Sequence, residues 1–289
     1  MPDPKHYPNA QNFRQALDER LKNMARQTNV SINDLHRQVV FDRFLARLDP
    51  ARFVLTGGYS LELRLPKSRS TTDIDLYIRD QQLLSANEDE QRQAILYALR
   101  QQTENEIPDH FTFEIERILG KLHGPKDGGI RCLVIARINN KDYHRFHVDV
   151  AVVPEQVLEP EYITPSEKLA FAGVESKPVA TLQMEEIFAN KIHAYTRPRL
   201  SENTRVEDII DMALLIESGL DNKKTLYSIV QVFAASADHQ TIPTTLKPPP
   251  TAWQKDFQEI SQRRNLTLSL DESFQRVKNF YELLPTIPT

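Results

Sequence analysis

Alternating hydrophobic and polar residues mark several half-buried β-strands along the chain. The strands predicted from alternation or from short apolar runs are residues 53–55, 72–78, 111–118, 130–138 and 146–153. Apolar residues that recur three and four positions apart predict helices before, between and after these strands. The predicted helices are residues 13–28, 31–48, 59–65, 80–103, 181–197 and 205–217. Together these elements indicate a mixed α/β (α+β) fold.

The strands and helices are unevenly distributed, which predicts a bilobal protein. All predicted strands begin before Pro154, and the rest of the chain is predominantly helical. We therefore expect an N-terminal mixed β-sheet with helices over residues 1–155 and a helical C-terminal lobe over residues 156–289. A chain of 289 residues is long enough for two such domains.

Composition limits the class of protein. Hydrophobic residues make up 40% and charged residues 26% of the chain, as in ordinary soluble globular proteins. No apolar run reaches the ~18 residues of a membrane helix, and the first residues lack the apolar core of a signal peptide. The single cysteine, Cys132, excludes an intramolecular disulfide. We expect a cytoplasmic protein without a membrane partner, and a net charge of −4 argues against a large nonspecific nucleic-acid footprint.

Residues 53–79 combine a glycine turn with paired carboxylates. Gly57 and Gly58 follow an apolar strand end and precede a short helix, whose free backbone N–H groups can bind an anion. In the next strand, Asp73 and Asp75 share one face because successive side chains point to opposite faces. Paired carboxylates suit a divalent cation, and the alternative is a strand with a solvated polar face. A phosphate site beside a metal site is what nucleotidyl transfer requires.

Two motifs carry a resemblance to a known family. The first is Gly57-Gly58, then Leu61, then Arg69-x-Thr71-x-Asp73-Ile74-Asp75-Leu76. The second is Glu185-Glu186-Ile187-x-Ala189-x-Lys191-x-x-Ala194, then Arg197, then Asp208-x-x-Asp211. Both resemble the AbiEii/AbiGii nucleotidyltransferase toxins, which belong to the polymerase-β-like nucleotidyltransferase superfamily and include the MenT toxins. The resemblance covers roughly residues 41–215.

Two positions depart from the pattern of this family. Tyr59 stands where the family usually has Thr, Ser or Ala, and Ser60 is an alternative source of the hydroxyl. Glu207 stands where the family commonly has Arg or Lys.

The resemblance implies a metal site built from three carboxylates. Asp73 and Asp75 would hold two Mg²⁺ ions together with Asp149, which lies on a strand of valines. From the residues alone, Asp149 is either an edge-facing side chain or a third ligand. The superfamily places a third Asp on the strand beside the Asp-x-Asp strand, which favours the ligand.

The resemblance also implies an NTP bound between the two lobes. Gly58, Tyr59 and Ser60, next to Gly57, would donate hydrogen bonds to the β- and γ-phosphates. Lys191 would contact a phosphate oxygen, and Asp208 or Asp211 would orient Lys191 or receive a ribose or acceptor hydroxyl. Arg69 would steer the triphosphate or brace its loop. The alternative for the second motif is a solvated Lys191 with Asp208 as its surface partner.

The function implied by the resemblance is that of a toxin in a toxin–antitoxin or abortive-infection system. It would transfer nucleotides from an NTP to RNA, with the tRNA 3′ end as the expected acceptor and a cognate antitoxin as partner. Cationic side chains on the N-terminal helices would form either an RNA-binding rim or a solvated face. They are Arg14, Arg20, Lys22, Arg26, Arg37, Arg43 and Arg47. Two alternatives stay open: an antibiotic-type small-molecule nucleotidyltransferase, and a nucleotide-binding protein without turnover.

Overall fold

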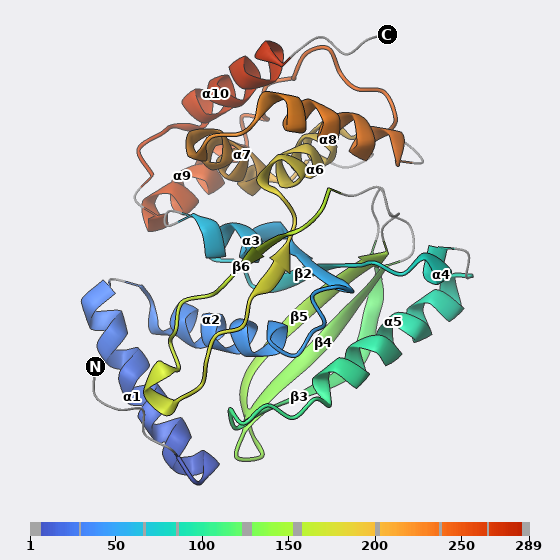
Figure 1. Ribbon diagram of the computed structural model, residues 1–289. Helices are drawn as coiled ribbons and strands as arrows, with labels where there is room; N and C mark the ends of the chain where they lie inside the picture. Colours follow the sequence, from blue (N-terminus) through green and yellow to red (C-terminus); the bar gives the residue numbers. More distant parts are fainter. Residues whose placement is uncertain are drawn as a thin grey trace.

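The computed structural model describes most of the chain and shows a mixed β-sheet with helices around it (Figure 1). The described residues are 7–28, 30–65, 68–84, 87–122, 129–152, 158–199, 203–236, 239–264 and 266–284. Within them, seven strands form one sheet in the order β3-β4-β5-β2-β1-β7-β6. The predicted α/β class is confirmed.

The strands span a wide part of the sequence. Their bounds are β1 (Phe53–Thr56), β2 (Asp73–Ile78), β3 (Phe111–Leu122), β4 (Gly129–Ile138), β5 (Lys141–Val152), β6 (Glu161–Ile163) and β7 (Val179–Thr181). β2 pairs in parallel with β5, and β1 pairs in parallel with β7. The other neighbouring strands are antiparallel.

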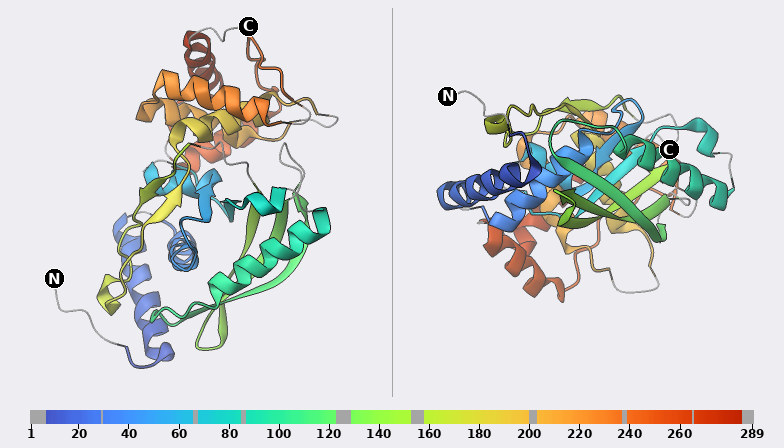
Figure 2. Two further views of the ribbon diagram at one scale, coloured as in Figure 1. Left: turned by 45° about the vertical axis from the view of Figure 1, so that its right-hand side comes forward. Right: turned by 90° about the horizontal axis from the view of Figure 1, so that it is seen from below.

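Five helices belong to the N-terminal part and five to the C-terminal part of the described chain. The first group is α1 (Ala10–Thr28), α2 (Ile32–Leu45), α3 (Gly57–Arg64), α4 (Gln81–Leu84) and α5 (Glu88–Thr103). The second group is α6 (Met184–Thr196), α7 (Val206–Ser218), α8 (Asn222–Ala234), α9 (Trp253–Arg264) and α10 (Leu270–Leu283). A short 3₁₀ turn covers Ala170–Ala172. Figures 1 and 2 show the second group gathered at one end of the molecule.

Two hydrophobic clusters hold these layers together. The first joins one face of the sheet to α1, α2 and α5, and the fully buried Ile74, Val148 and Val150 lie in it. The second is built mainly from α6 to α10, and Val54 and Leu61 extend it to β1 and α3. Strand alternation therefore leaves the opposite face of β2 and β5 for polar side chains.

Several predicted boundaries change in the structure. The helix predicted over residues 80–103 is two helices, because Asn87 caps α5 by accepting a 3.0 Å hydrogen bond from the Glu90 N–H. The helix predicted over residues 181–197 begins only at Met184, because Val179–Thr181 form β7. β5 begins at Lys141, ahead of the predicted start.

The sheet does not end near residue 154, as the sequence predicted, because β6 and β7 extend it. Pro154 itself lies outside the described residues. The sheet thus draws strands from both sides of residue 155, and the division into domains 1–155 and 156–289 stays a prediction. No helix in the described part of the chain is long and apolar enough to cross a membrane.

Candidate active site

The glycine turn joins β1 to α3 and packs against the segment that carries the first two aspartates. Gly57 has a φ of 66°, in the left-handed region that favours glycine. A Cβ at Gly57 would overlap the Asp75 carboxylate, and a Cβ at Gly58 would lie 2.8 Å from Thr71 Oγ1. Both positions therefore require glycine. The first turn of α3, with its free backbone N–H groups, lies beside Asp75.

The three predicted carboxylates lie on adjacent strands. In the pairing of β2 with β5, Asp75 lies opposite Asp149 and Asp73 lies opposite His147. Paired residues point to the same face of a sheet, so the three aspartates share one face. Burial raises the pKa of Asp75, and the negative charges of Asp149 and Asp73 raise it further, to about 6. Negative charge is therefore concentrated here, which favours the binding of a cation.

A guanidinium group neutralises two of these carboxylates. Arg131 on β4 is the cross-strand partner of Asp149 and donates hydrogen bonds of 2.7 and 2.8 Å to its two oxygens. It also donates a 3.2 Å hydrogen bond to Asp73 Oδ2. Among the residues that the structure describes, no group of three or more His, Cys, Asp or Glu side chains is arranged as a metal-binding site. Arg131 was not identified as a site residue from the sequence, although a charged residue inside the apolar run 130–138 indicates a side chain with a specific polar partner.

Lys191 on α6 is buried against two carboxylates of α7. Its Nζ donates hydrogen bonds of 2.9 Å to Asp208 and 2.7 Å to Asp211. Burial alone lowers the pKa of Lys191, but Asp208 and Asp211 outweigh it and the pKa is raised. The alternative of a solvated Lys191 is wrong, because the residue is only 8% exposed. Asp208 Oδ2 and Asp211 Oδ1 are buried without a hydrogen-bond partner among the described residues.

Arg69 connects the glycine turn to this charged group. A Cβ at Gly58 would lie 3.4 Å from Arg69 Nη2, and Arg69 Nε lies 3.4 Å from Asp211 Oδ2. The positive charges of Lys191 and Arg69 both lower the pKa of Asp75, against the larger effect of burial. The glycine turn, the aspartates of the sheet and the Lys191 group therefore form one site.

The ends of two neighbouring strands explain how segments far apart in sequence meet here. β1 leads directly into α3, and β7 leads into α6, which carries Lys191. The two strands are parallel, so both helices begin at the same edge of the sheet. The Leu182 N–H donates a 3.0 Å hydrogen bond to the Leu55 carbonyl and extends this pairing. Tyr77 of β2 also hydrogen-bonds with Asn190 of α6.

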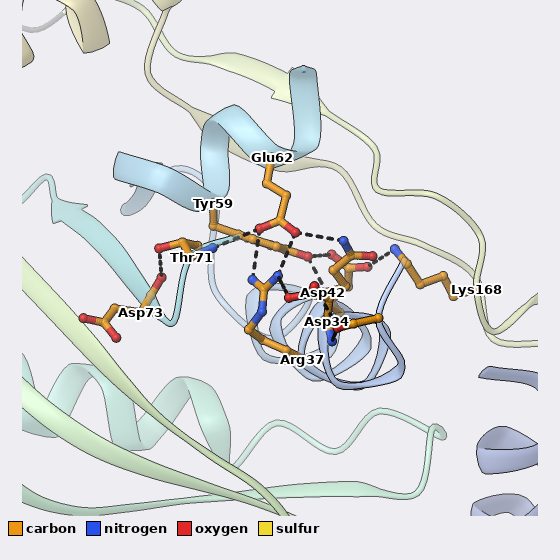
Figure 3. A network of polar contacts seen from close by, with 10 residues as sticks. Asp34, Arg37, Asp42, Tyr59, Glu62, Thr71, Asp73 and Lys168 are labelled. Atoms are coloured by element: carbon orange, nitrogen blue, oxygen red, sulfur yellow. Dashed lines mark hydrogen bonds and ion pairs between the residues drawn. The ribbon is translucent and has the colours of Figure 1, made fainter. Parts of the chain in front are cut away.

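The side chains of Tyr59 and Ser60 do not face a phosphate at the turn. Figure 3 shows the Tyr59 ring extending toward Asp42 and Lys168, away from the Asp73 carboxylate. The Tyr59 hydroxyl donates a 2.6 Å hydrogen bond to Asp42 Oδ1, and Lys168 donates to the other oxygen. Ser60 is fully buried and its hydroxyl donates to the Gly57 carbonyl. Only the backbone N–H groups of these two residues are therefore suited to bind an anion.

Glu62 on α3 anchors the segment that precedes Asp73 (Figure 3). It accepts hydrogen bonds of 3.0 and 2.7 Å from Arg37 and 2.8 Å from Gln38, both on α2. The Thr71 N–H donates a 3.4 Å hydrogen bond to the same carboxylate. This network positions the start of β2 relative to α3.

The predicted RNA-binding rim on the N-terminal helices is partly wrong. Arg37, Arg43 and Arg47 are buried, because Arg37 pairs with Glu62 and the other two pair with Asp109. The remaining members of the set, Arg14, Arg20, Lys22 and Arg26, belong to α1. Figures 1 and 2 place α1 at the end of the molecule opposite α6 to α10.

A different group of arginines lies next to the Lys191 carboxylates. Arg205 is half exposed, and its Nη1 lies 3.8 Å from Asp208 Oδ2. Partial burial lowers the pKa of Arg199, and the positive charges of Arg205 and Arg197 lower it further. Arg197, Arg199 and Arg205, which we term the arginine cluster, therefore concentrate positive charge beside the site. Sequence reasoning noted Arg197 in the second motif and missed the other two.

Comparison with known proteins gives a family and a fold. A family model described as nucleotidyl transferase AbiEii toxin, type IV TA system, matches residues 38–280. The solved structure of MenT4, a nucleotidyltransferase toxin from Mycobacterium tuberculosis H37Rv, has a TM-score of 0.57 and 17% identity, over 93% of this chain and 99% of that one. JHP933 from Helicobacter pylori has a TM-score of 0.46 and 13% identity, over 88% of this chain and 93% of its own. No curated protein matches the chain.

Proposed function

The chain belongs to the AbiEii nucleotidyl transferase toxin family of type IV toxin–antitoxin systems, and on this premise we propose that it transfers nucleotides from an NTP to RNA with Mg²⁺. The observation that carries this proposal is the meeting of the glycine turn with the face on which Asp75 lies opposite Asp149. An anion site and a group of oxygen ligands are then neighbours, as nucleotidyl transfer requires.

The metal would be held by Asp73, Asp75 and Asp149. The donor set fits Mg²⁺, which prefers carboxylate oxygens. Burial and the negative charges of Asp149 and Asp73 raise the pKa of Asp75, and a cation would relieve the repulsion between these charges. A bound Mg²⁺ would neutralise phosphate charge and favour ionisation of the attacking hydroxyl. Asp73 is held in place through Thr71 and Glu62, so the ligands are positioned by the surrounding fold.

The triphosphate would bind at the first turn of α3. Backbone N–H groups of Gly58, Tyr59 and Ser60 would donate to its oxygens, and Arg69 beside Gly58 would add a positive charge. Lys191 would contact a phosphate oxygen as a charged ammonium, since Asp208 and Asp211 raise its pKa.

Asp208 and Asp211, two carboxylates of α7, would receive a hydroxyl group. Asp211 Oδ1 and Asp208 Oδ2 are buried acceptors with no hydrogen-bond partner among the described residues. Buried acceptors of this kind are normally satisfied, so a ribose or acceptor hydroxyl is a suitable donor. Asp208 and Asp211 also orient Lys191 through direct hydrogen bonds.

We propose that the acceptor is RNA, with the tRNA 3′ end as the expected group. The arginine cluster supports this, because three neighbouring arginines beside the site can follow a phosphate backbone. With a net charge of −4, contact should be limited to an end or a stem. A cognate antitoxin is the implied protein partner, and the cytoplasm is the proposed location.

A labelling experiment tests the function and separates the alternatives. The protein is incubated with each labelled NTP, Mg²⁺ and either total tRNA or aminoglycosides. We expect label in tRNA that is lost in the Asp73→Ala protein. Transfer to an aminoglycoside alone would instead identify a small-molecule enzyme, and NTP binding without transfer to either would identify a protein without turnover.

A salt series tests the RNA surface. The Arg199→Ala, Arg205→Ala protein should bind tRNA more weakly and show a shallower dependence of affinity on salt than the wild type. The control carries Arg20→Ala and Lys22→Ala on α1, and its tRNA affinity should be unchanged. If the control loses affinity and the cluster variant does not, the RNA surface lies on α1.

A further inference from the structure

Arg131 uses the oxygens that a divalent cation at this site would need. It donates to both oxygens of Asp149 and to Oδ2 of Asp73. A guanidinium group bound to both oxygens of a carboxylate is a strong and geometrically specific contact. A cation that coordinates Asp149 therefore shares these oxygens with the guanidinium and is repelled by its positive charge.

The position of Arg131 is set by the sheet. Cross-strand pairing of β4 with β5 places Arg131 directly opposite Asp149, and Asp149 is in turn opposite Asp75 on β2. The guanidinium thus enters the carboxylate group from the neighbouring strand, on the side away from the glycine turn and Lys191. The strand spacing fixes the separation of the Arg131 and Asp149 backbones, so the guanidinium contacts Asp149 without movement of the backbone.

The environment of Arg131 allows its guanidinium to move away from Asp73 and Asp149. Its side chain is 40% exposed, whereas those of Asp149 and Asp73 are 13% and 27% exposed. An exposed guanidinium loses little on release to water, while the less exposed carboxylates need a counter-ion in either case. Arginine stays protonated, so the contact is broken only by movement of the side chain or by a competing cation.

We propose that Arg131 is an internal counter-ion that competes with the divalent cation for Asp73 and Asp149 and so sets the concentration of metal at which the site fills. This inference rests on the metal site of the proposed function and adds a residue that neither matched motif includes. Binding of the metal would weaken or displace the contacts of the guanidinium with these two carboxylates. Arg131 is therefore a positioning residue that holds the carboxylates near each other and weakens metal binding.

The test measures metal binding directly. Wild-type protein, freed of metals with EDTA and then dialysed, is titrated with Mn²⁺ at pH 8, and free Mn²⁺ is followed by electron paramagnetic resonance. At this pH Asp75, with its pKa of about 6, is ionised. Arg131→Gln should bind Mn²⁺ about tenfold more tightly, because one competing positive charge is removed. Arg131→Lys, which keeps the charge but not the forked contact, should lie between the two.

Arg137→Gln on the same strand is the matched control, since Arg137 pairs with Glu114 and Asp142 on the hairpin. Its Mn²⁺ affinity should equal that of the wild type. Unchanged or weaker Mn²⁺ binding by Arg131→Gln, with a near-ultraviolet circular dichroism spectrum like that of the wild type, would overturn the competition. If Arg131→Gln does not fold, the Mn²⁺ affinities of the wild type and Arg131→Lys are compared instead. Equal or weaker Mn²⁺ binding by Arg131→Lys would then overturn the proposed competition. Failure of the wild type to bind Mn²⁺ would instead contradict the metal part of the proposed function.

Discussion

The Asp75 carboxylate occupies the space in which a side chain at Gly57 would begin. Gly57 directly follows β1, whose last residue, Thr56, pairs with Asp75 on the antiparallel strand β2. Gly57 is therefore required twice, once for its φ of 66° and once for the room it leaves to a carboxylate. The turn and the aspartate cannot be changed independently.

Gly57→Ala should lower the free energy of unfolding by more than the about 1–2 kcal/mol that a left-handed alanine costs. The extra loss comes from the overlap with Asp75, which must move. Gly219→Ala is the matched control, because Gly219 also has a positive φ but a Cβ added there would meet nothing within 4 Å. Urea unfolding of both variants gives the difference, and equal losses would contradict the close approach of Asp75.

Tyr59→Phe should lower stability and leave NTP binding unchanged. The variant loses a 2.6 Å hydrogen bond to Asp42 that is buried, which costs about 1–3 kcal/mol. The ring would stay packed edge-on against Phe41. Urea unfolding measures the loss, and equilibrium NTP binding measures the site. A weaker NTP affinity at unchanged stability would show that the phenol contacts the nucleotide.

The pH dependence of the free energy of unfolding should reveal the raised pKa of Asp75. Burial and the charges of Asp149 and Asp73 raise its pKa in the folded protein from 3.8 to about 6, against the opposing charges of Lys191 and Arg69. Between these values the folded state holds a proton that the unfolded state has lost, so the contribution of Asp75 to stability falls as pH rises.

Asp75→Asn should therefore gain stability relative to the wild type as pH rises from about 4 to 7, by at most about 3 kcal/mol. The comparison uses urea unfolding in EDTA, so that metal binding does not contribute. A difference between variant and wild type that is constant with pH would mean that Asp75 has an ordinary pKa.

Lys191→Ala should both destabilise the protein and abolish transfer. It leaves Asp208 and Asp211 buried without their shared counter-ion, a change that costs about 3–5 kcal/mol for a buried ion pair. Lys191→Arg should not restore activity, because a planar fork cannot take the place of an ammonium between these two oxygens. The control is Lys223→Ala at an exposed position on α8. Normal turnover by Lys191→Ala would show that Lys191 has no role in the transfer reaction.

The local sequence pattern was enough to predict the aspartate pair and the glycine turn of the site. Strand alternation placed Asp73 and Asp75 on one face, and the glycine pair marked the turn. The family resemblance, and not the strand pattern, implied that Asp149 lies beside them, and its position opposite Asp75 agrees with this. Asp73 and Asp75 lie on one strand, so the period of the pattern reports their geometry.

Contacts between distant segments could not be predicted in this way. Arg43 and Arg47 were predicted to lie on an RNA-binding rim or a solvated face. They are buried because they pair with Asp109, more than sixty residues away in the sequence. β7 has only three residues, too few to show a period. The role of Arg131 depends on strand register, which no local pattern determines.

The position of β7 beside β1 also has a consequence for synthesis of the protein. While the chain grows, β1 keeps an open edge until residues 179–182 emerge, and the helix that carries Lys191 follows only after them. A nascent chain therefore cannot complete its site before α7 has emerged from the ribosome. A chain that ends at residue 178 should allow normal growth when expressed, and its unpaired strand edge should make it aggregate.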